Sequence, residues 1–258
     1  MGNTEPVVKL EKDDQIAVIT LNRPEKLNAF NIEMRDQLYE IIQIIKEDPT
    51  IHAAVLCGAG RGFCAGADLS EFGTNPTVIE KRRIRLQRDL WEEIRRLPKP
   101  ITAALHGFAV GSGLEMSMLC DFRFAAPDTV LSLPEAKLGM LPAAGGTQSL
   151  PRLVSQGVSL EFTFNGNRIT AEEGYKKKLI SKVVAREALL DTAINYMKKV
   201  VSNSAKSASM IKSLVADNMD VSLQQGILRE KILVEKSWQV RKKKIGNSDL
   251  ALGLGDSQ

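Results

Sequence analysis

The chain contains few of the residues that build metal centres and disulfide frameworks. Its 258 residues include two histidines and three cysteines, and Cys57, Cys64 and Cys120 form an odd and scattered set. Zinc sites and disulfide scaffolds need paired or closely spaced ligands. The sequence therefore predicts free thiols in a reducing compartment and no bound metal.

Long apolar runs are also missing. No stretch approaches the roughly 18–20 apolar residues that cross a bilayer. Residues 1–6 have neither the basic flank nor the apolar centre of a secretory signal, and Pro6 stands where a myristoylation site needs Ser or Thr. We expect a cytoplasmic protein with no membrane partner, and a processed mitochondrial matrix form stays open.

Charge of one sign is present only in small excess, since the net charge is +4. A mildly basic balance suits an anionic ligand but does not by itself indicate nucleic acid. The basic stretches at 81–88 and 241–244 lack interleaved aromatic residues. We interpret them as solvated helix faces, so a nucleic acid partner is not expected, and RNA binding remains a remote alternative.

Strand-like and helix-like segments alternate in the N-terminal half. The apolar patterns predict strands at 15–22, 51–57, 101–105, 122–126 and 130–133. They predict helices at 31–46, 76–97 and 113–119. From residue 170 onward only helical patterns remain, through 182 and over 187–201 and 205–236. Repeated β-β-α units followed by helices predict an α/β core with a helical C-terminal third.

Two glutamates stand in glycine-bearing segments that can turn both side chains toward one point. Glu115 ends the segment 105–115, and Glu135 lies in the segment 131–139. One carboxylate can take a proton from water while the other delivers a proton to carbon. Such a pair suits the addition of water to an activated double bond. Taken singly, Glu115 is better explained as a helix cap and Glu135 as a surface residue.

Small residues mark two candidate sites for exposed backbone N–H groups. Residues 65–67 are small enough for a ligand to approach the main chain, and 107–115 lies at a strand-to-helix junction. One N–H from each segment would form an oxyanion hole. The alternative is that both segments are only tight turns. Neither has the spacing of a phosphate loop or a dinucleotide-binding loop.

The sequence resembles the enoyl-CoA hydratase/isomerase (crotonase) superfamily over about residues 7–235. The resemblance is carried by motifs at 22–29, 63–69, 106–115, 120–121, 133–139, 142–148, 166–172 and 179–184. It implies a crotonase-type spiral of β-β-α turns over residues 1–195. It also implies a helical region, 196–258, that assembles homotrimers, usually paired into homohexamers.

The resemblance further implies an acyl-CoA ligand and no cofactor other than the coenzyme A of that thioester. The N–H groups of Ala67 and Ser112 would hold the thioester oxygen. The path of the adenine and pantetheine groups would be lined by main-chain groups around Lys26, Leu27, Ala65, Asp68 and Leu69.

Members that hydrate double bonds keep both carboxylates, and both are present here. Glu115 would deprotonate the water that attacks C3 of a 2-enoyl-CoA, and Glu135 would supply the proton to C2. Hydration of a cyclic enoyl-CoA, double-bond isomerisation and thioester hydrolysis are the alternatives within the superfamily. The chain departs from the pattern at Ser112 and Ala143, where glycine is frequent, and after residue 236, where the usual ending is not recognisable.

Overall fold

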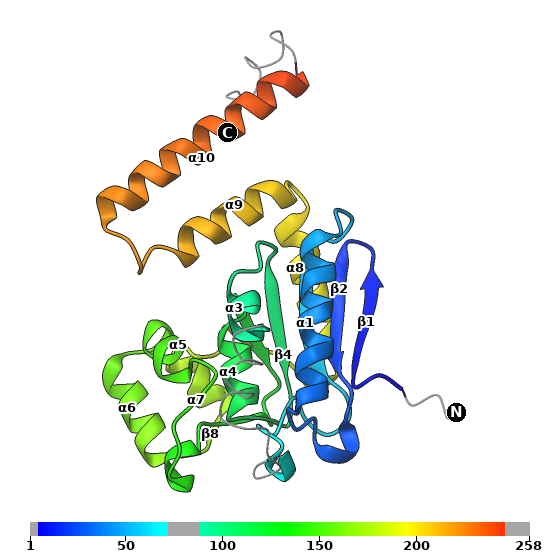
Figure 1. Cartoon of the computed structure of the whole chain (residues 1–258), viewed down its shortest axis with the longest axis vertical. Coiled ribbons are helices and arrows are strands. Elements are labelled where there is room, and N and C mark those ends of the chain that lie inside the picture. Colours follow the sequence, from blue (N-terminus) through cyan, green and yellow to red (C-terminus); the bar gives the residue numbers. More distant parts are fainter. Residues whose placement is uncertain (1–4, 72–87, 246–258) are drawn as a thin grey trace. The chain divides into compact units, whose positions relative to one another are not determined.

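The structure is a computed structural model that describes residues 5–71 and 88–245, with side chains through residue 238. The chain forms two compact units, residues 1–205 and 206–258 (Figure 1). The boundary predicted after residue 195 falls inside α8 (Leu189–Val201), which belongs to the first unit. Most of the helix predicted over 76–97 lies outside the described residues, as do the side chains of 241–244.

A six-stranded sheet forms the framework of the first unit. Its spatial order is β1 (Val8–Asp13), β2 (Ile16–Leu21), β3 (Ala53–Gly58), β4 (Ile101–Leu105), β6 (Phe122–Ala125) and β9 (Lys182–Val183). Only β1 runs antiparallel to its neighbour. The whole of β4 is buried, as expected for a central parallel strand that is covered on both faces.

A smaller sheet contains β5 (Phe108–Val110), β7 (Val130–Ser132) and β8 (Ile169–Thr170). The pairs β4–β5 and β6–β7 each divide between the sheets, because β4 and β6 join the large sheet whereas β5 and β7 join the small one. Helix α4 (Ser112–Met118) follows the β4–β5 pair. This succession confirms the predicted α/β spiral of β-β-α turns.

Helix α1 (Ile32–Glu47) covers the start of the large sheet. The Asn31 side chain caps it by accepting a hydrogen bond from the N–H of Met34 at 2.9 Å. Its buried face is apolar at helical spacing, with Met34, Leu38, Ile41, Ile42 and Ile45. Helix α8 packs against β3 and β4, and α3 (Leu90–Arg95) packs against α1.

Short elements complete the first unit. They are the 3₁₀ turns η1 (Pro24–Lys26), η2 (Leu69–Glu71), η3 (Glu135–Leu138) and η4 (Arg186–Ala188), and the helices α5 (Gly146–Leu153), α6 (Gln156–Asn165) and α7 (Ala171–Lys176). The expectation of helix alone after residue 170 was wrong, because Lys182 and Val183 pair with β6.

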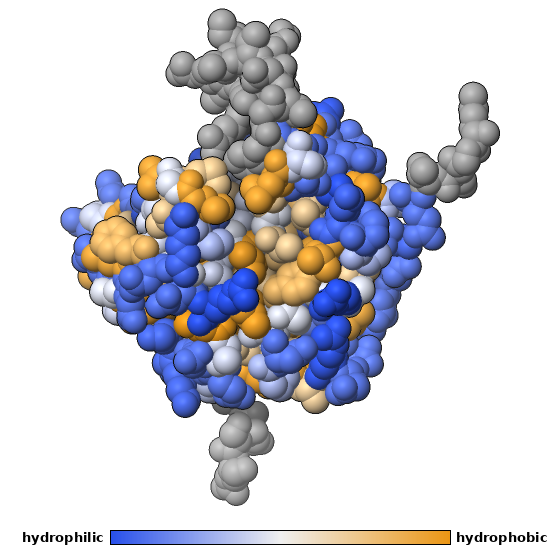
Figure 2. Space-filling view, turned by 90° about the horizontal axis from the view of Figure 1, so that it is seen from below, coloured by the Kyte–Doolittle hydropathy of each residue, from blue (hydrophilic) through white to orange (hydrophobic). Residues whose placement is uncertain are grey.

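On the face seen in Figure 2, hydrophobic residues gather toward the middle and hydrophilic ones dominate the edge.

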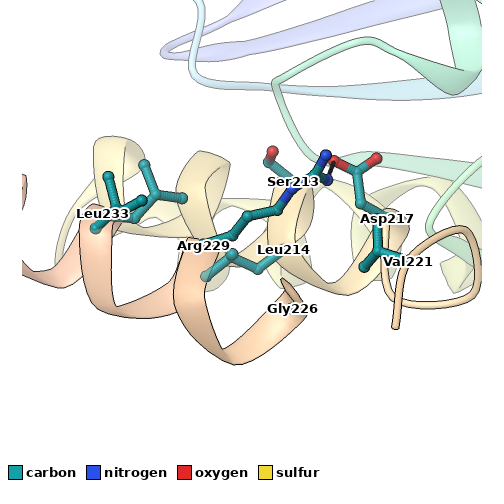
Figure 3. A pocket seen from close by; sticks show the side chains of 8 residues that line it. Ser213, Leu214, Asp217, Val221, Gly226, Arg229 and Leu233 are labelled. Atoms are coloured by element: carbon teal, nitrogen blue, oxygen red, sulfur yellow. Dashed lines mark hydrogen bonds and ion pairs between the residues drawn. The ribbon is translucent and has the colours of Figure 1, made fainter. Parts of the chain in front are cut away.

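The second unit contains most of α9 (Ala205–Ala216) and all of α10 (Leu223–Ile245). One continuous helical stretch was predicted over 205–236, but the chain breaks between these helices. Ser222 and Gln225 exchange hydrogen bonds between side chain and main chain, which starts α10. Arg229 of α10 forms an ion pair with Asp217 at 3.1 Å, and both residues line a pocket between the two helices (Figure 3).

Candidate active site

Glu115 is a buried carboxylate held by main-chain donors. It lies on α4 with 1% of its surface exposed. Its Oε1 accepts hydrogen bonds from the N–H of Ala144 at 2.9 Å and of Gly146, the first residue of α5, at 2.8 Å. Main-chain N–H groups stabilise negative charge. The two donors therefore fix the orientation of Glu115 and suit it to accept a proton.

Glu135 lies at the start of η3 in a contrasting environment. Its Oε2 is buried and has no hydrogen-bond partner among the residues that the structure describes. Burial raises the pKa of Glu135 above its usual value, and the charge of Glu115 raises it further. The shift makes this carboxyl hold a proton more strongly than an exposed glutamate does, which suits it to donate a proton.

Glycines let the backbone approach both carboxyl groups closely. A Cβ on Gly111 would lie 2.7 Å from Oε1 of Glu135, and a Cβ on Gly146 would lie 2.9 Å from Oε1 of Glu115. Gly111 is also the residue that precedes α4, the helix that carries Glu115. The fold thus brings the two glutamates, which are distant in the sequence, into one electrostatically coupled site.

Ala67 lies in a loop held on both sides. The N–H of Phe30 donates to the carbonyl of Gly66 at 2.7 Å, and the N–H of Asp68 donates to the carbonyl of Phe30 at 2.9 Å. Between these bonds, the N–H of Ala67 donates to no group in the described part of the chain. It is a fixed main-chain donor available to a ligand.

Ser112 offers the second N–H. It is the first residue of α4, where a backbone N–H has no intrahelical partner, and no side chain caps this end. Gly111 before it has φ 51° and ψ −125°, a conformation that favours glycine. A Cβ on Gly66 would lie 3.9 Å from the Cα of Gly111, so the loops that carry the two donors are in contact.

The residues expected along the coenzyme A path lie around the same loops. Lys26 and Leu27 are exposed, and the carbonyl of Leu27 accepts the N–H of Ala65 at 3.1 Å. Leu69 is 61% exposed at the start of η2. The Asp68 side chain is engaged by Arg23 at 3.0 Å and by Ser70, so main-chain groups are what this segment offers a ligand.

Other candidates have structural surroundings. Cys64 is fully buried, and burial raises the pKa of its thiol to about 12, which excludes a thiolate nucleophile at neutral pH. His106 contacts the carbonyl of Gly60 through Nε2 at 3.1 Å. No group of three or more potential metal ligands occurs among the described residues.

Two buried polar residues close to the site were missed from the sequence. Arg123 is 3% exposed and donates to the carbonyls of Leu179, Ser117 and Cys120, the last two at the C-terminal end of α4. Asn28 is fully buried beside the Ala67 loop. The signal for Arg123 was a lone charge within the apolar strand Phe-Arg-Phe-Ala, whereas Asn28 in a turn gave none.

The fold and the site define an α/β protein in which the carboxyl groups of Glu115 and Glu135 lie close to two contacting loops with exposed main-chain N–H groups. Comparison with known proteins assigns it more closely. The profile of the enoyl-CoA hydratase/isomerase family matches residues 11–250. The chain belongs to this family, which confirms the resemblance seen in the motifs.

Its relatives include several hydratases. The chain is 34% identical to the mitochondrial enoyl-CoA hydratase of Pongo abelii, over 92% of this chain and 81% of the relative. It is 36% identical to the (E)-benzylidenesuccinyl-CoA hydratase of Thauera aromatica, over 88% of each. The crystal structure of enoyl-CoA hydratase from Bacillus anthracis superposes with a TM-score of 0.84 at 32% identity, covering 92% of this chain and 96% of that one.

Proposed function

We propose that this protein is an enoyl-CoA hydratase, a lyase that reversibly adds water to a 2-enoyl-CoA and gives a 3-hydroxyacyl-CoA. Relatives with this name match most of the chain at about a third identity. The observation that carries the proposal is the contrast between the paired glutamates. Glu115 has two N–H donors on one oxygen, whereas Glu135 has a buried oxygen without a partner in the described residues.

The contrast supports the following roles in the reaction. Glu115 takes a proton from water as the water oxygen attacks C3. The electrons of the double bond move toward the thioester carbonyl, and the N–H groups of Ala67 and Ser112 stabilise the enolate oxygen. Glu135 then gives its proton to C2. Because both glutamates act from one face of the substrate, water adds syn.

This chemistry needs no metal and no redox cofactor, since the glutamates supply acid and base and the N–H groups supply electrostatic stabilisation. Coenzyme A enters as part of the substrate, along the main chain around Lys26, Leu27, Ala65, Asp68 and Leu69. Three buried cysteines that form no disulfide suit a reducing compartment, and we propose the cytoplasm. No helix in the described ranges is long and apolar enough to cross a membrane.

The second unit is proposed to assemble the protein into homotrimers or homohexamers. It exposes large apolar side chains at Ile211, Val215, Met219, Leu223, Leu228, Ile232 and Trp238. Apolar surface of this extent is typical of protein interfaces. Light scattering coupled to size-exclusion chromatography should give three or six times the monomer mass of 28.4 kDa, and a monomer at micromolar concentration would refute the assembly.

The reaction is tested with crotonyl-CoA by the loss of absorbance of the conjugated thioester. The Glu135→Gln variant should lose about 100- to 10,000-fold in kcat and should still bind butyryl-CoA, a saturated thioester that cannot react. Undiminished hydration by this variant would refute the assignment. Free coenzyme A serves as the control ligand, because it lacks the acyl group.

A ring-bearing enoyl-CoA is a second candidate substrate, favoured by the similarity to the Thauera aromatica hydratase. A panel of crotonyl-CoA, cyclohexenoyl-CoA and a 3-enoyl-CoA ranks these substrates by kcat/KM. Preference for the cyclic thioester would assign the protein to ring-derived substrates. Turnover of the 3-enoyl-CoA alone would indicate an isomerase.

A further inference from the structure

Asn28 is a buried polar residue that none of the steps above uses. Its side chain is 0% exposed and makes three hydrogen bonds to main-chain groups. Oδ1 accepts the N–H of Arg23 at 2.8 Å, and Nδ2 donates to the carbonyls of Ala59 at 2.8 Å and Gly62 at 2.9 Å. Both amide hydrogens of Asn28 are therefore used.

The backbone at this point is in an unusual conformation. Leu27 and Asn28 are consecutive left-handed residues, with φ 54° and 55°. Asparagine tolerates this region, whereas leucine rarely occupies it, so the surroundings must hold the turn in place. The carbonyl of Leu27 faces the second loop and accepts the N–H of Ala65. The exposed turn at 26–27 is thereby attached to the loop that carries Ala67.

The bonds of Asn28 reach both ends of this arrangement. Toward its own loop, Asn28 closes the turn onto the N–H of Arg23. In the donor loop, which is the loop that carries Ala67, the carbonyl of Gly62 accepts a hydrogen bond from Asn28. The carbonyl of Gly66 in the same loop accepts one from the N–H of Phe30. The segment before Ala67 is consequently pinned to the turn that precedes α1. No other side chain in the described residues bonds both Arg23 N–H and the donor loop.

We propose that Asn28 is a positioning residue that sets the distance between the coenzyme A turn, Lys26 and Leu27, and the oxyanion donor Ala67. The inference rests on the proposed function and deepens it. A ligand held at its nucleotide end by the turn delivers its thioester oxygen to the donor only if the two loops keep one spacing. Small displacements of a donor cost large factors in rate.

Two substitutions separate the hydrogen bonds from the backbone conformation. Asn28→Gly accepts positive φ and removes all three bonds. Asn28→Asp keeps the size and the acceptor for Arg23 but places an oxygen against the carbonyls of Ala59 and Gly62. Asn22→Ala is the matched control, because among the described residues the Asn22 side chain bonds Glu5 and Pro6 and nothing else. If Asn28→Gly does not fold, Asn28→Asp decides.

The first measurement is binding, at a temperature where circular dichroism shows each variant folded. The Kd of free coenzyme A measures binding at the turn of Lys26 and Leu27. The gain in affinity from free coenzyme A to butyryl-CoA measures the contribution of the oxyanion donors. We expect Kd for free coenzyme A to rise about tenfold in the Asn28 variants, and the gain from the butyryl group to fall at least about threefold. The control should stay within about twofold. An unchanged gain in both Asn28 variants would overturn the proposal.

The second measurement is kcat on saturating crotonyl-CoA per folded enzyme. It should fall about ten- to a hundredfold in the Asn28 variants, whereas a role in stability alone leaves it unchanged and overturns the proposal. The proposed function fails separately if the wild type binds butyryl-CoA but does not hydrate crotonyl-CoA. The binding comparison then still tests Asn28. A wild type that binds no coenzyme A would overturn both.

Discussion

Burial raises the pKa of Glu135, and the negative charge of neighbouring Glu115 raises it further. The two carboxyl groups are chemically identical, yet one oxygen of Glu115 accepts two N–H groups while an oxygen of Glu135 is buried without a partner in the described residues. Under the proposed function these environments favour Glu115 as the base and Glu135 as the acid. We therefore expect the pair to be active with a single proton and to titrate as one coupled system.

The pH profile of kcat/KM should be bell-shaped. It falls at acid pH as the pair takes a second proton, and at basic pH as it loses the last one. Because the pKa of Glu135 is raised, the basic limb should lie above the usual range of a glutamate. Hydration consumes no net proton, so dehydration of 3-hydroxybutyryl-CoA should give the same profile. A profile that falls on one side only would contradict a pair that is active with a single proton.

The same raised pKa predicts how Glu135 affects stability. The folded state binds the Glu135 proton more tightly than the unfolded state, so this contribution to the free energy of unfolding is present at acid pH and is lost as pH rises. Glu135→Gln should therefore have a higher Tm than the wild type at about pH 7, and the difference should shrink at about pH 4. Thermal unfolding at both pH values checks this, and a pH-independent difference would refute it.

Gly111→Ala should inactivate the protein through Glu135. The new Cβ would lie 2.7 Å from Oε1 of Glu135, at a residue with φ 51°, and we expect kcat on crotonyl-CoA to fall at least about 100-fold. Gly139→Ala is the control, because Gly139 also has positive φ but nothing lies within 4 Å of its Cβ position. Gly139→Ala should lose about 1–2 kcal/mol of stability from its left-handed backbone, and Gly111→Ala should lose more, because its φ 51° and ψ −125° lie outside the left-handed region and its Cβ also meets Glu135. Equal losses of kcat in the two would show that backbone strain is the cause.

Gly146→Ala tests the hold on Glu115. Its Cβ would lie 2.9 Å from Oε1 of Glu115 and 3.0 Å from Pro142, so the carboxylate must move. We expect kcat to fall at least about tenfold. Gly157→Ala in α6 meets nothing within 4 Å, and it should keep wild-type kcat and gain about 1 kcal/mol of stability from helix propensity. Full activity of Gly146→Ala would contradict the role of these donors.

Much of the fold could be predicted from the sequence where apolar patterns are long. The helix at 31–46 and the strand at 101–105 correspond to α1 and β4. Strands β5 and β9 were missed, because their three and two residues carry too little periodicity, and the six-residue β1 was missed as well. The break between α9 and α10 was missed because apolar residues continue through it at nearly helical spacing.

The site shows a similar division. Glu115 and Glu135 could be selected because each adjoins glycines and a helix or turn start. Their different environments could not be predicted from the sequence. These environments depend on the N–H groups of Ala144 and Gly146, whose direction is set where α5 begins. Asn28 was not selected either, because its role depends on bonds to carbonyls about thirty residues away.

Hydration of crotonyl-CoA by the wild type, Glu115→Gln, Glu135→Gln and the double variant tests most directly whether the two glutamates act on one water molecule. Residues that act as a unit are strongly non-additive. We predict that kcat of the double variant lies no more than about tenfold below kcat of the less active single variant. Losses in kcat that multiply would contradict a shared site.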